Sequence, residues 1–235
     1  MNPFTEAFGE ASQLILSADP ELLEIIGLSM RVTLTAVIAA CIVGFPLGAL
    51  LAVGRFPGRA VLSVIITAFM GLPPVVAGLT VYLLFSASGP LGALQLLYTP
   101  TVMVIAQAIL VTPIIAALTR QVVADLNAEY DELLRAMNAT WMTRVGTLLW
   151  DARYSLLTAA LAGLGRALAE VGAVMIVGGN INHVTRVMTT AIALETSRGA
   201  LALALALGMI LIALTIAING ALMALSTTME RRAHV

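Results

Sequence analysis

Long apolar stretches alternate with short polar segments along most of the chain. Five of them are long enough to cross a bilayer, which takes about 20 apolar residues. They run over residues 26–53, 60–85, 101–123, 156–177 and 200–225. This pattern predicts an all-α, polytopic membrane protein with five transmembrane helices in one domain, residues 25–226. A segment of residues 1–24 precedes that domain, and a tail of residues 227–235 follows it.

The composition agrees with a lipid environment. Hydrophobic residues make up 60% of the chain and charged residues 11%, and the mean hydropathy is +1.01. A soluble domain carries about 25% charged residues. All 12 basic residues are arginine, which excludes a P-loop, because that motif needs a lysine on the nucleotide phosphates. The net charge of −1 gives no indication of a nucleic-acid partner.

Arginine placement predicts the orientation, because cytoplasmic loops are enriched in basic residues. The arginines that follow the first, third and fifth spans are Arg55, Arg59, Arg120, Arg135, Arg144, Arg153, Arg231 and Arg232. The opposite side has only Arg186 and Arg198, with Arg31 near the start of the first span. We therefore expect a cytoplasmic C-terminus and a periplasmic, acidic N-terminus in the inner membrane.

Proline and glycine interrupt two of the spans. The first contains Gly-Phe-Pro-Leu-Gly at 44–48, and the second contains Pro73 and Pro74 near mid-membrane. Proline removes a backbone hydrogen bond, which is tolerated in lipid only where protein or a cavity satisfies the freed group. Two interpretations stay open: a kink that serves packing, or a broken helix that lines a translocation path.

The predicted cytoplasmic side has one long loop, residues 125–151. Its apolar residues fall on one face of a helix. They are Leu126, Tyr130, Leu133, Leu134, Met137 and Trp141. Such a helix either lies on the membrane or docks into a groove on a partner. The acidic first half of this loop favours a protein partner.

Several motifs occur in the order typical of one transporter family. They occupy residues 29–33, 44–48, 55–59, 71–78, 88–92, 97–100, 163–172, 177–181 and 185–195. Together they resemble type I ABC transporter permeases, and most closely the permeases of tungstate importers, which are related to molybdate permeases. In the family's Glu-Ala-Ala loop motif, only Glu132 and the apolar Leu148 match directly. Leu133 and Leu134 stand for the alanines, Asn138 for the glycine and Asp151 for the proline.

The resemblance implies a function and a set of partners. The chain would be the membrane subunit of an ATP-driven importer for a tungstate-like oxyanion, with no cofactor and no enzymatic activity of its own. A separate ABC ATPase and an extracytoplasmic tungstate-binding protein would complete the importer. The residues implied to couple to the ATPase are Asp131, Glu132, Arg135, Ala136, Met137 and Asn138. Because five helices do not easily enclose a gated path, we expect a homodimer surrounded by lipid.

Charged and polar residues near the fourth span are candidates for the anion path, together with Pro73 and Pro74. Arg166 and Glu170 are four residues apart, so they would pair on one helix face near mid-bilayer. The pair either neutralises itself for packing or presents Arg166 to an oxyanion. Beyond the span, free backbone amides and hydroxyls suit a tetrahedral oxyanion. These residues are Gly178, Gly179, Asn180, Thr185, Thr189 and Thr190, and the alternative is a periplasmic turn before a short interfacial helix.

Other functions stay open at this stage. A permease for molybdate or sulfate is the nearest alternative. A secondary transporter driven by an ion gradient usually shows internal repeats, and none is visible in the sequence. A membrane enzyme would need an assembled catalytic set, which the sequence does not display. His183 and His234 have no ligands at metal-site spacing, so we expect no metal.

Overall fold

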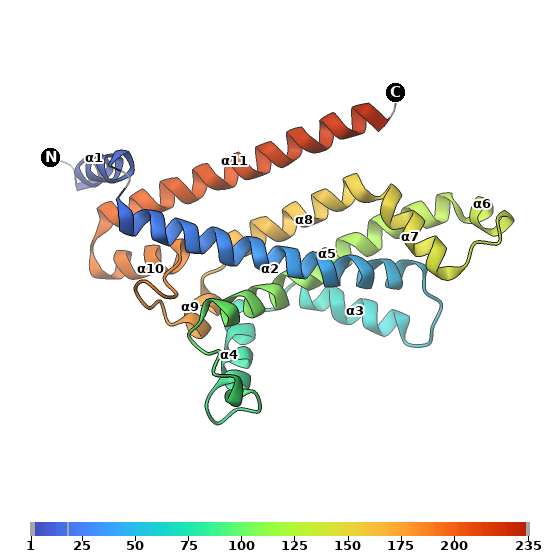
Figure 1. Ribbon diagram of the computed structural model, residues 1–235, viewed down its shortest axis with the longest axis horizontal. Coiled ribbons are helices and arrows are strands. Elements are labelled where there is room, and N and C mark those ends of the chain that lie inside the picture. The colour runs from blue at the N-terminus through green and yellow to red at the C-terminus, as the bar shows by residue number, and fades with distance from the viewer. Residues whose placement is uncertain (1–2, 18, 234–235) are drawn as a thin grey trace. The chain divides into compact units, whose positions relative to one another are not determined.

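The structure is a computed structural model that describes residues 3–17 and 19–233. Those residues form eleven α-helices and one 3-10 helix and contain no strand, which confirms the all-α prediction (Figure 1). The elements are α1 (Pro3–Leu16), α2 (Pro20–Val53), α3 (Arg59–Phe69), α4 (Pro74–Phe85), η1 (Gly92–Leu94), α5 (Pro100–Glu129), α6 (Asp131–Ala136), α7 (Trp141–Asp151), α8 (Arg153–Leu168), α9 (Gly172–Gly178), α10 (Met188–Arg198) and α11 (Leu201–Ala233).

The apolar helices lie where the hydropathy pattern places spans. Three are long and apolar enough to cross a membrane: α2, α5 and α11. Two helix pairs also qualify, each bent at a short break: α3 with α4, by 104°, and α8 with α9, by 60°. The described residues thus hold three spans, or up to five if each bent pair is one span. The count of five stays a prediction, as do the domain boundaries at 25 and 226.

The two proline-containing segments behave differently. Between Phe69 and Pro74 the helix is interrupted, so the break in the second stretch is confirmed. Pro73 occupies the N-cap position of α4 and Pro74 its first turn, where a missing N–H costs nothing. In contrast, α2 continues through Pro46 as one helix, and the interruption expected at 44–48 is not formed.

The chain forms two compact units. The first comprises Met1–Thr35, Pro73–Gln107 and Leu168–Ile218, and the second comprises Ala36–Leu72, Ala108–Ala167 and Asn219–Val235. The helices α2, α5 and α11 each contribute to both units. Each unit has its own apolar core.

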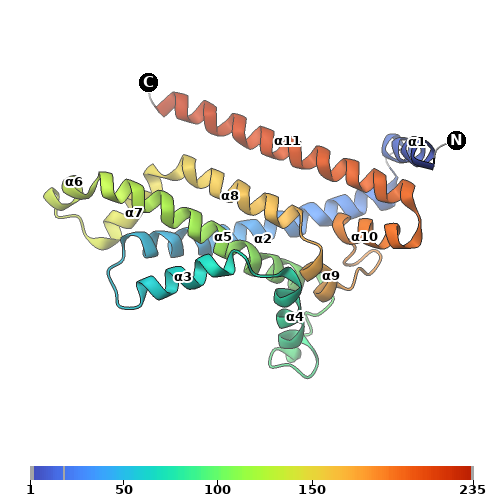
Figure 2. The same cartoon turned by 180° about the vertical axis from the view of Figure 1, so that it is seen from behind.

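In the first unit, α4 and α9 lie side by side, as Figures 1 and 2 both show. They approach closely because Gly78 lacks a side chain: a Cβ there would lie 2.7 Å from the Cα of Ala173. Small residues permit such close helix contacts in lipid. A second cluster joins α1, the start of α2, α10 and the start of α11. Its buried members are Ala11, Leu22, Ile25, Met188, Ala191, Ala206 and Leu207.

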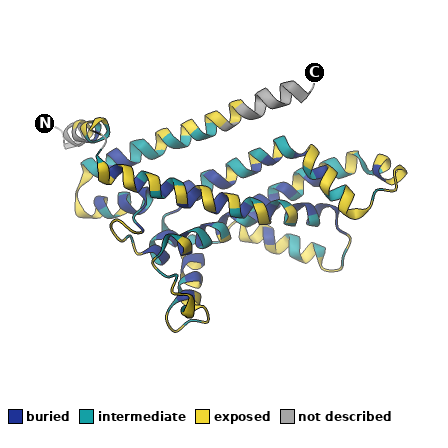
Figure 3. Ribbon diagram, in the orientation of Figure 1, coloured by how far each residue is buried: buried dark blue, intermediate teal, exposed yellow. Residues whose placement is uncertain are grey.

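In the second unit, α2 and α5 pack through glycine. A Cβ on Gly48 would lie 2.5 Å from the carbonyl oxygen of Ala116, and one on Gly44 would lie 2.8 Å from Ile115. The motif at 44–48 therefore serves helix packing, the first of the two interpretations that the sequence left open. Figure 3 shows that α2 and α5 carry many buried residues, whereas the described part of α11 is mostly half-buried or exposed.

Candidate coupling surface and anion path

The segment 125–151 is helical, as predicted, but its apolar residues do not share one continuous helix. The chain instead forms the end of α5, the short α6 and then α7. Asn138, with a φ of 48°, ends α6 in the left-handed conformation that glycine favours. Asparagine tolerates this conformation better than most other side chains, which is consistent with Asn138 standing for the glycine of the loop motif that this segment resembles. Thr140 begins α7, since its hydroxyl accepts a hydrogen bond from the Thr143 amide at 3.3 Å.

The apolar residues of this loop are divided between the core and the surface. Leu134 is buried, and Leu126 and Tyr130 pack on the same cluster. Leu133 and Met137 point away from it and are 60% and 69% exposed. The cluster fixes the loop against α2, α5 and α8. Its buried members are Ala49, Ala52, Val53, Val123, Leu134, Leu148, Ala152 and Leu156.

Asp131 is the electrostatic link between α6 and α7. Its carboxylate pairs with Arg144 at 2.6 Å and with Arg135 at 2.7 Å. The hydrogen bond from Arg144 is the largest effect on the pKa of Asp131 and lowers it; desolvation opposes this, but the hydrogen bond from Arg135 and the charges of both arginines keep the pKa below its ordinary value. The side chain of Arg144 is only 15% exposed, so this ion pair is better shielded than one at a free surface.

The predicted coupling residues are accessible to a partner. Asp131 is half-buried, and the other five are exposed: Glu132, Arg135, Ala136, Met137 and Asn138. The sequence did not assign Leu133 or Met142 to this surface, yet both are large, apolar and exposed, Met142 at 70%. Leu133 was predicted to lie on the apolar face of a helix in this loop, whereas Met142 was not identified from the sequence. Contact of this surface with an ATPase stays a prediction.

A groove on α3 and α5 that contains an arginine and two hydroxyl residues was not anticipated from the sequence. It has a volume of about 530 Å³ and is lined by Ser63, Val64, Thr67, Ala68 and Arg120. Within the described part of the chain, the Arg120 guanidinium has no ion pair or hydrogen bond. Ser63 and Thr67 are one helical turn apart, so they lie on the same face of α3. The sequence alone does not show that this face lies near Arg120, because that depends on the packing of α3 against α5.

The backbone that carries Arg120 is firmly placed. Leu51, Ile66, Ala116 and Ala117 form a buried cluster between α2, α3 and α5, one turn before Arg120. The close approach at Gly48 also reaches the Arg120 amide nitrogen. A cationic side chain is therefore held beside two hydroxyls by three packed helices.

In the first unit, the predicted oxyanion segment is a tightly bonded turn. The Thr185 hydroxyl donates to the carbonyl oxygen of Gly178 at 2.5 Å and accepts from the Ile181 amide at 3.0 Å. The Thr190 hydroxyl lies 2.9 Å from Oδ1 of Asn180. Thr185 and Thr190 are both fully buried.

These bonds match the alternative interpretation, a turn followed by the short helix α10. The turn uses left-handed backbone at two successive residues: Gly179 has a φ of 68° and Asn180 a φ of 50°. The hydroxyls of Thr185 and Thr190 already serve the chain itself. A role for this segment in the anion path stays a prediction.

Glu170 does not share a helix with Arg166, contrary to the sequence-based expectation. Arg166 lies in the last turn of α8, where a cation is favoured by the helix dipole. Glu170 lies in the break before α9, is 2% exposed, and its carboxylate accepts a hydrogen bond from the Ala173 amide at 2.9 Å. Its carbonyl oxygen also accepts from the Thr189 hydroxyl at 2.8 Å.

The same unit carries further charge pairs beside the turn. Arg186, 11% exposed, contacts Glu21 at 3.3 Å and Glu195 at 4.0 Å. His183 lies 2.7 Å from Glu24. Among the described residues, no three His, Cys, Asp or Glu side chains could hold a metal ion, and His234 lies outside those residues.

Apolar spans interrupted at short breaks, together with a loop folded against their ends, define a polytopic membrane protein. Residues 44–231 match the family model described as the binding-protein-dependent transport system inner membrane component. The chain belongs to this family, which confirms the resemblance to ABC transporter permeases. It is therefore a multi-pass inner-membrane protein and not an enzyme. It works with an ATPase, which is a separate subunit, and with a substrate-binding protein.

Individual relatives are similar over most of their length. The tungstate uptake system permease protein TupB of Peptoclostridium acidaminophilum is 38% identical over 225 residues, which is 96% of this chain and 99% of that protein. A probable anion ABC transporter permease protein of Haloferax volcanii is 37% identical, covering 84% and 88% of the two chains. TupB of Campylobacter jejuni is 33% identical, covering 91% and 90%.

Proposed function

We propose that this chain is the permease subunit of a tungstate importer. The observation that carries the proposal is the 38% identity to a tungstate permease along nearly the full length of both chains. A second tungstate permease and a probable anion permease are also similar, at 33% and 37% identity. Tungstate, molybdate and sulfate are all tetrahedral dianions, so molybdate and sulfate are the competing substrates.

The assembly we propose contains two copies of this chain in lipid, each with its N-terminus outside and its C-terminus in the cytoplasm. The arginine distribution supports this orientation. Coupling to the ATPase is assigned to the exposed side chains of α6 and the residues that follow it. The buried cluster behind them and the Asp131 ion pairs support this, because a rigid loop transmits a displacement at its surface to α2, α5 and α8.

The groove at Arg120 supplies a contact for the anion in this proposal. A guanidinium that has no carboxylate partner, beside a hydroxyl donor, suits a tetrahedral oxyanion. The Thr67 hydroxyl already donates to the backbone carbonyl oxygen of Ser63 at 2.9 Å, so the donor beside Arg120 is the Ser63 hydroxyl, which has no hydrogen bond among the described residues. The groove is open, so the anion would be held briefly, as a translocation step requires.

Uptake by the reconstituted complex tests the proposal. The permease, its ATPase and its binding protein are placed in proteoliposomes, and ATP-dependent uptake of labelled tungstate is measured with competing molybdate or sulfate. We expect uptake that a small excess of molybdate or sulfate does not abolish. Preferential uptake of sulfate would overturn the tungstate assignment, and binding of each anion to the isolated binding protein gives an independent ranking.

Two matched variants test the groove in the same assay. Arg120→Gln should lower uptake by about 10-fold or more, because a hydrogen bond to a charged group contributes about 1.5–3 kcal/mol. Arg55→Gln removes an exposed arginine of the neighbouring loop and should leave uptake unchanged. Equal uptake by the two variants would remove Arg120 from the path without affecting the family assignment.

A further inference from the structure

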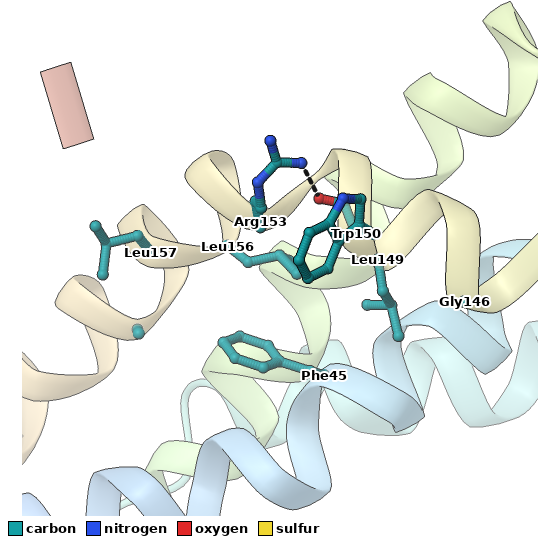
Figure 4. Close-up of a pocket in the computed structure, with 8 residues that line it drawn as sticks. Phe45, Gly146, Leu149, Trp150, Arg153, Leu156 and Leu157 are labelled. Carbon is teal, nitrogen blue, oxygen red and sulfur yellow. Dashed lines mark hydrogen bonds between the residues drawn. The ribbon is translucent and has the colours of Figure 1, made fainter. Parts of the chain in front are cut away.

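A further groove lies in the second unit, on α2, α7 and α8, and shares no lining residue with the groove at Arg120. Its volume is about 510 Å³. Figure 4 shows its lining, which consists of Phe45, Gly146, Leu149, Trp150, Arg153, Leu156, Leu157 and Ala160. Seven of these eight residues are apolar or glycine, and Arg153 is the one charged residue among them.

Arg153 is held at the groove by its neighbours. Its Nη1 donates to the carbonyl oxygen of Trp150 at 2.7 Å, and its Nη2 donates to the Tyr154 hydroxyl at 3.2 Å. The guanidinium carbon lies 5.0 Å from the centre of the Trp150 ring and 4.5 Å from that of Tyr154. A guanidinium has five N–H donors, so three remain for a ligand. In the described part of the chain no carboxylate pairs with Arg153.

The groove lies at one end of an apolar span. Arg153 is the first residue of α8, and Leu156, Leu157 and Ala160 follow on the apolar part of that helix. Trp150 is 69% exposed, although it is large and amphipathic. Tryptophan and tyrosine are enriched where a span meets the lipid headgroups. A cation and two aromatic rings at this depth, above an apolar groove, match the two ends of a phospholipid.

We propose that this groove binds an anionic phospholipid. One acyl chain lies along the apolar wall formed by Phe45, Leu156 and Leu157, and the headgroup phosphate accepts hydrogen bonds from Arg153. Arg153 is the only charged residue in the lining of the groove, and its positive charge favours an anionic headgroup over a zwitterionic one. Basic pockets between transmembrane helices select anionic lipids in the same way. The identity of the transported anion plays no part in this inference.

Tryptophan fluorescence tests the site directly. The chain has two tryptophans, so Trp141→Phe leaves Trp150 as the sole reporter, inside the groove. The protein is reconstituted with phosphatidylglycerol or phosphatidylcholine brominated on the acyl chains, at equal bromine content. We expect brominated phosphatidylglycerol to occupy the site with about fivefold preference. Equal quenching by the two lipids would overturn the proposal.

Two variants separate the headgroup contact from the acyl-chain contact. Arg153→Gln should abolish the preference, while Arg55→Gln, in a loop outside the groove, should retain it. Gly146→Leu should reduce quenching by both lipids, because a Cβ at Gly146 meets no atom within 4 Å and the added side chain fills the groove. An unchanged preference in Arg153→Gln would refute the site. If neither lipid quenched Trp150, the groove would not be open to lipid, which would also refute the proposal.

Discussion

Replacing Gly48 by alanine should destabilise the permease, because no space exists for one added carbon. Its Cβ would lie 2.5 Å from the carbonyl oxygen of Ala116, 2.6 Å from the Cβ of Thr119 and 2.9 Å from the amide nitrogen of Arg120. All three distances are below ordinary van der Waals contact, and two of the three atoms belong to backbone. The helices α2 and α5 must therefore move apart. Overpacking of this kind costs about 1–3 kcal/mol.

Gly27→Ala is the matched control in the same helix. A Cβ at Gly27 meets nothing within 4 Å, so only the helix propensity changes, a gain of about 0.5–1 kcal/mol. For a protein of this size, 1 kcal/mol moves the midpoint of thermal unfolding by about 2–4 °C. We expect a midpoint about 2–12 °C lower for Gly48→Ala and about 1–4 °C higher for Gly27→Ala.

The single cysteine provides the assay. Cys41 is partly buried in α2, so a dye that fluoresces on reaction with thiols reports its exposure as the purified protein is heated. Both variants keep Cys41, and their curves can be compared directly with that of the parent. A midpoint for Gly48→Ala at or above that of Gly27→Ala would refute the close packing of α2 on α5.

Four further predictions concern topology, coupling and charge. In a Cys41→Ala background, cysteines at positions 10 and 233 should react with impermeant reagents from the outside and from the cytoplasm respectively; labelling of position 10 only from the cytoplasm would reverse the assigned orientation. Glu132→Arg should reduce co-purification of the ATPase while membrane insertion stays normal, and unchanged association and transport would count against the coupling surface. Because the pKa of Asp131 is held below its ordinary value of 3.8, its stabilising contribution is present above that pH and lost as the pH falls through the lowered value. Asp131→Asn should therefore lower the unfolding midpoint at pH 7 but change it little at very low pH. An equal fall in the midpoint at both pH values would contradict the ion-pair account. Glu170→Ala should lower folded yield, since loss of a helix cap costs about 0.5–2 kcal/mol. If the double variant Arg166→Ala, Glu170→Ala regains folded yield but not uptake, the two residues act on the anion as well as on packing. Full uptake by the double variant would exclude a role in the anion path.

The positions of the apolar helices were determined by the sequence alone. Each depends on a local property, namely the length of a hydrophobic run, and no distant residue is needed to read it. The break between Phe69 and Pro74 was equally local, because two successive prolines cannot donate the hydrogen bonds that would continue α3. The all-α class followed from these hydrophobic runs, and the permease family followed from the order of the motifs.

The tertiary structure decided how the remaining polar and small residues are used. Pro46 did not break α2, since Gly44 and Gly48 fit that helix against α5, which is some 70 residues further along the chain. Contacts with α2 and α8 decided which apolar residues of the 125–151 loop are buried and which are exposed. Helical periodicity within the loop does not predict these contacts, because they involve residues far away in the sequence. Likewise, Arg166 and Glu170 were predicted to lie on one continuous helix, but α8 ends at Leu168 and the Glu170 carboxylate accepts a hydrogen bond from an amide at the start of α9. Spacing in sequence fixes which residues can share a face only while the helix continues, and whether it continues depends on what packs against it.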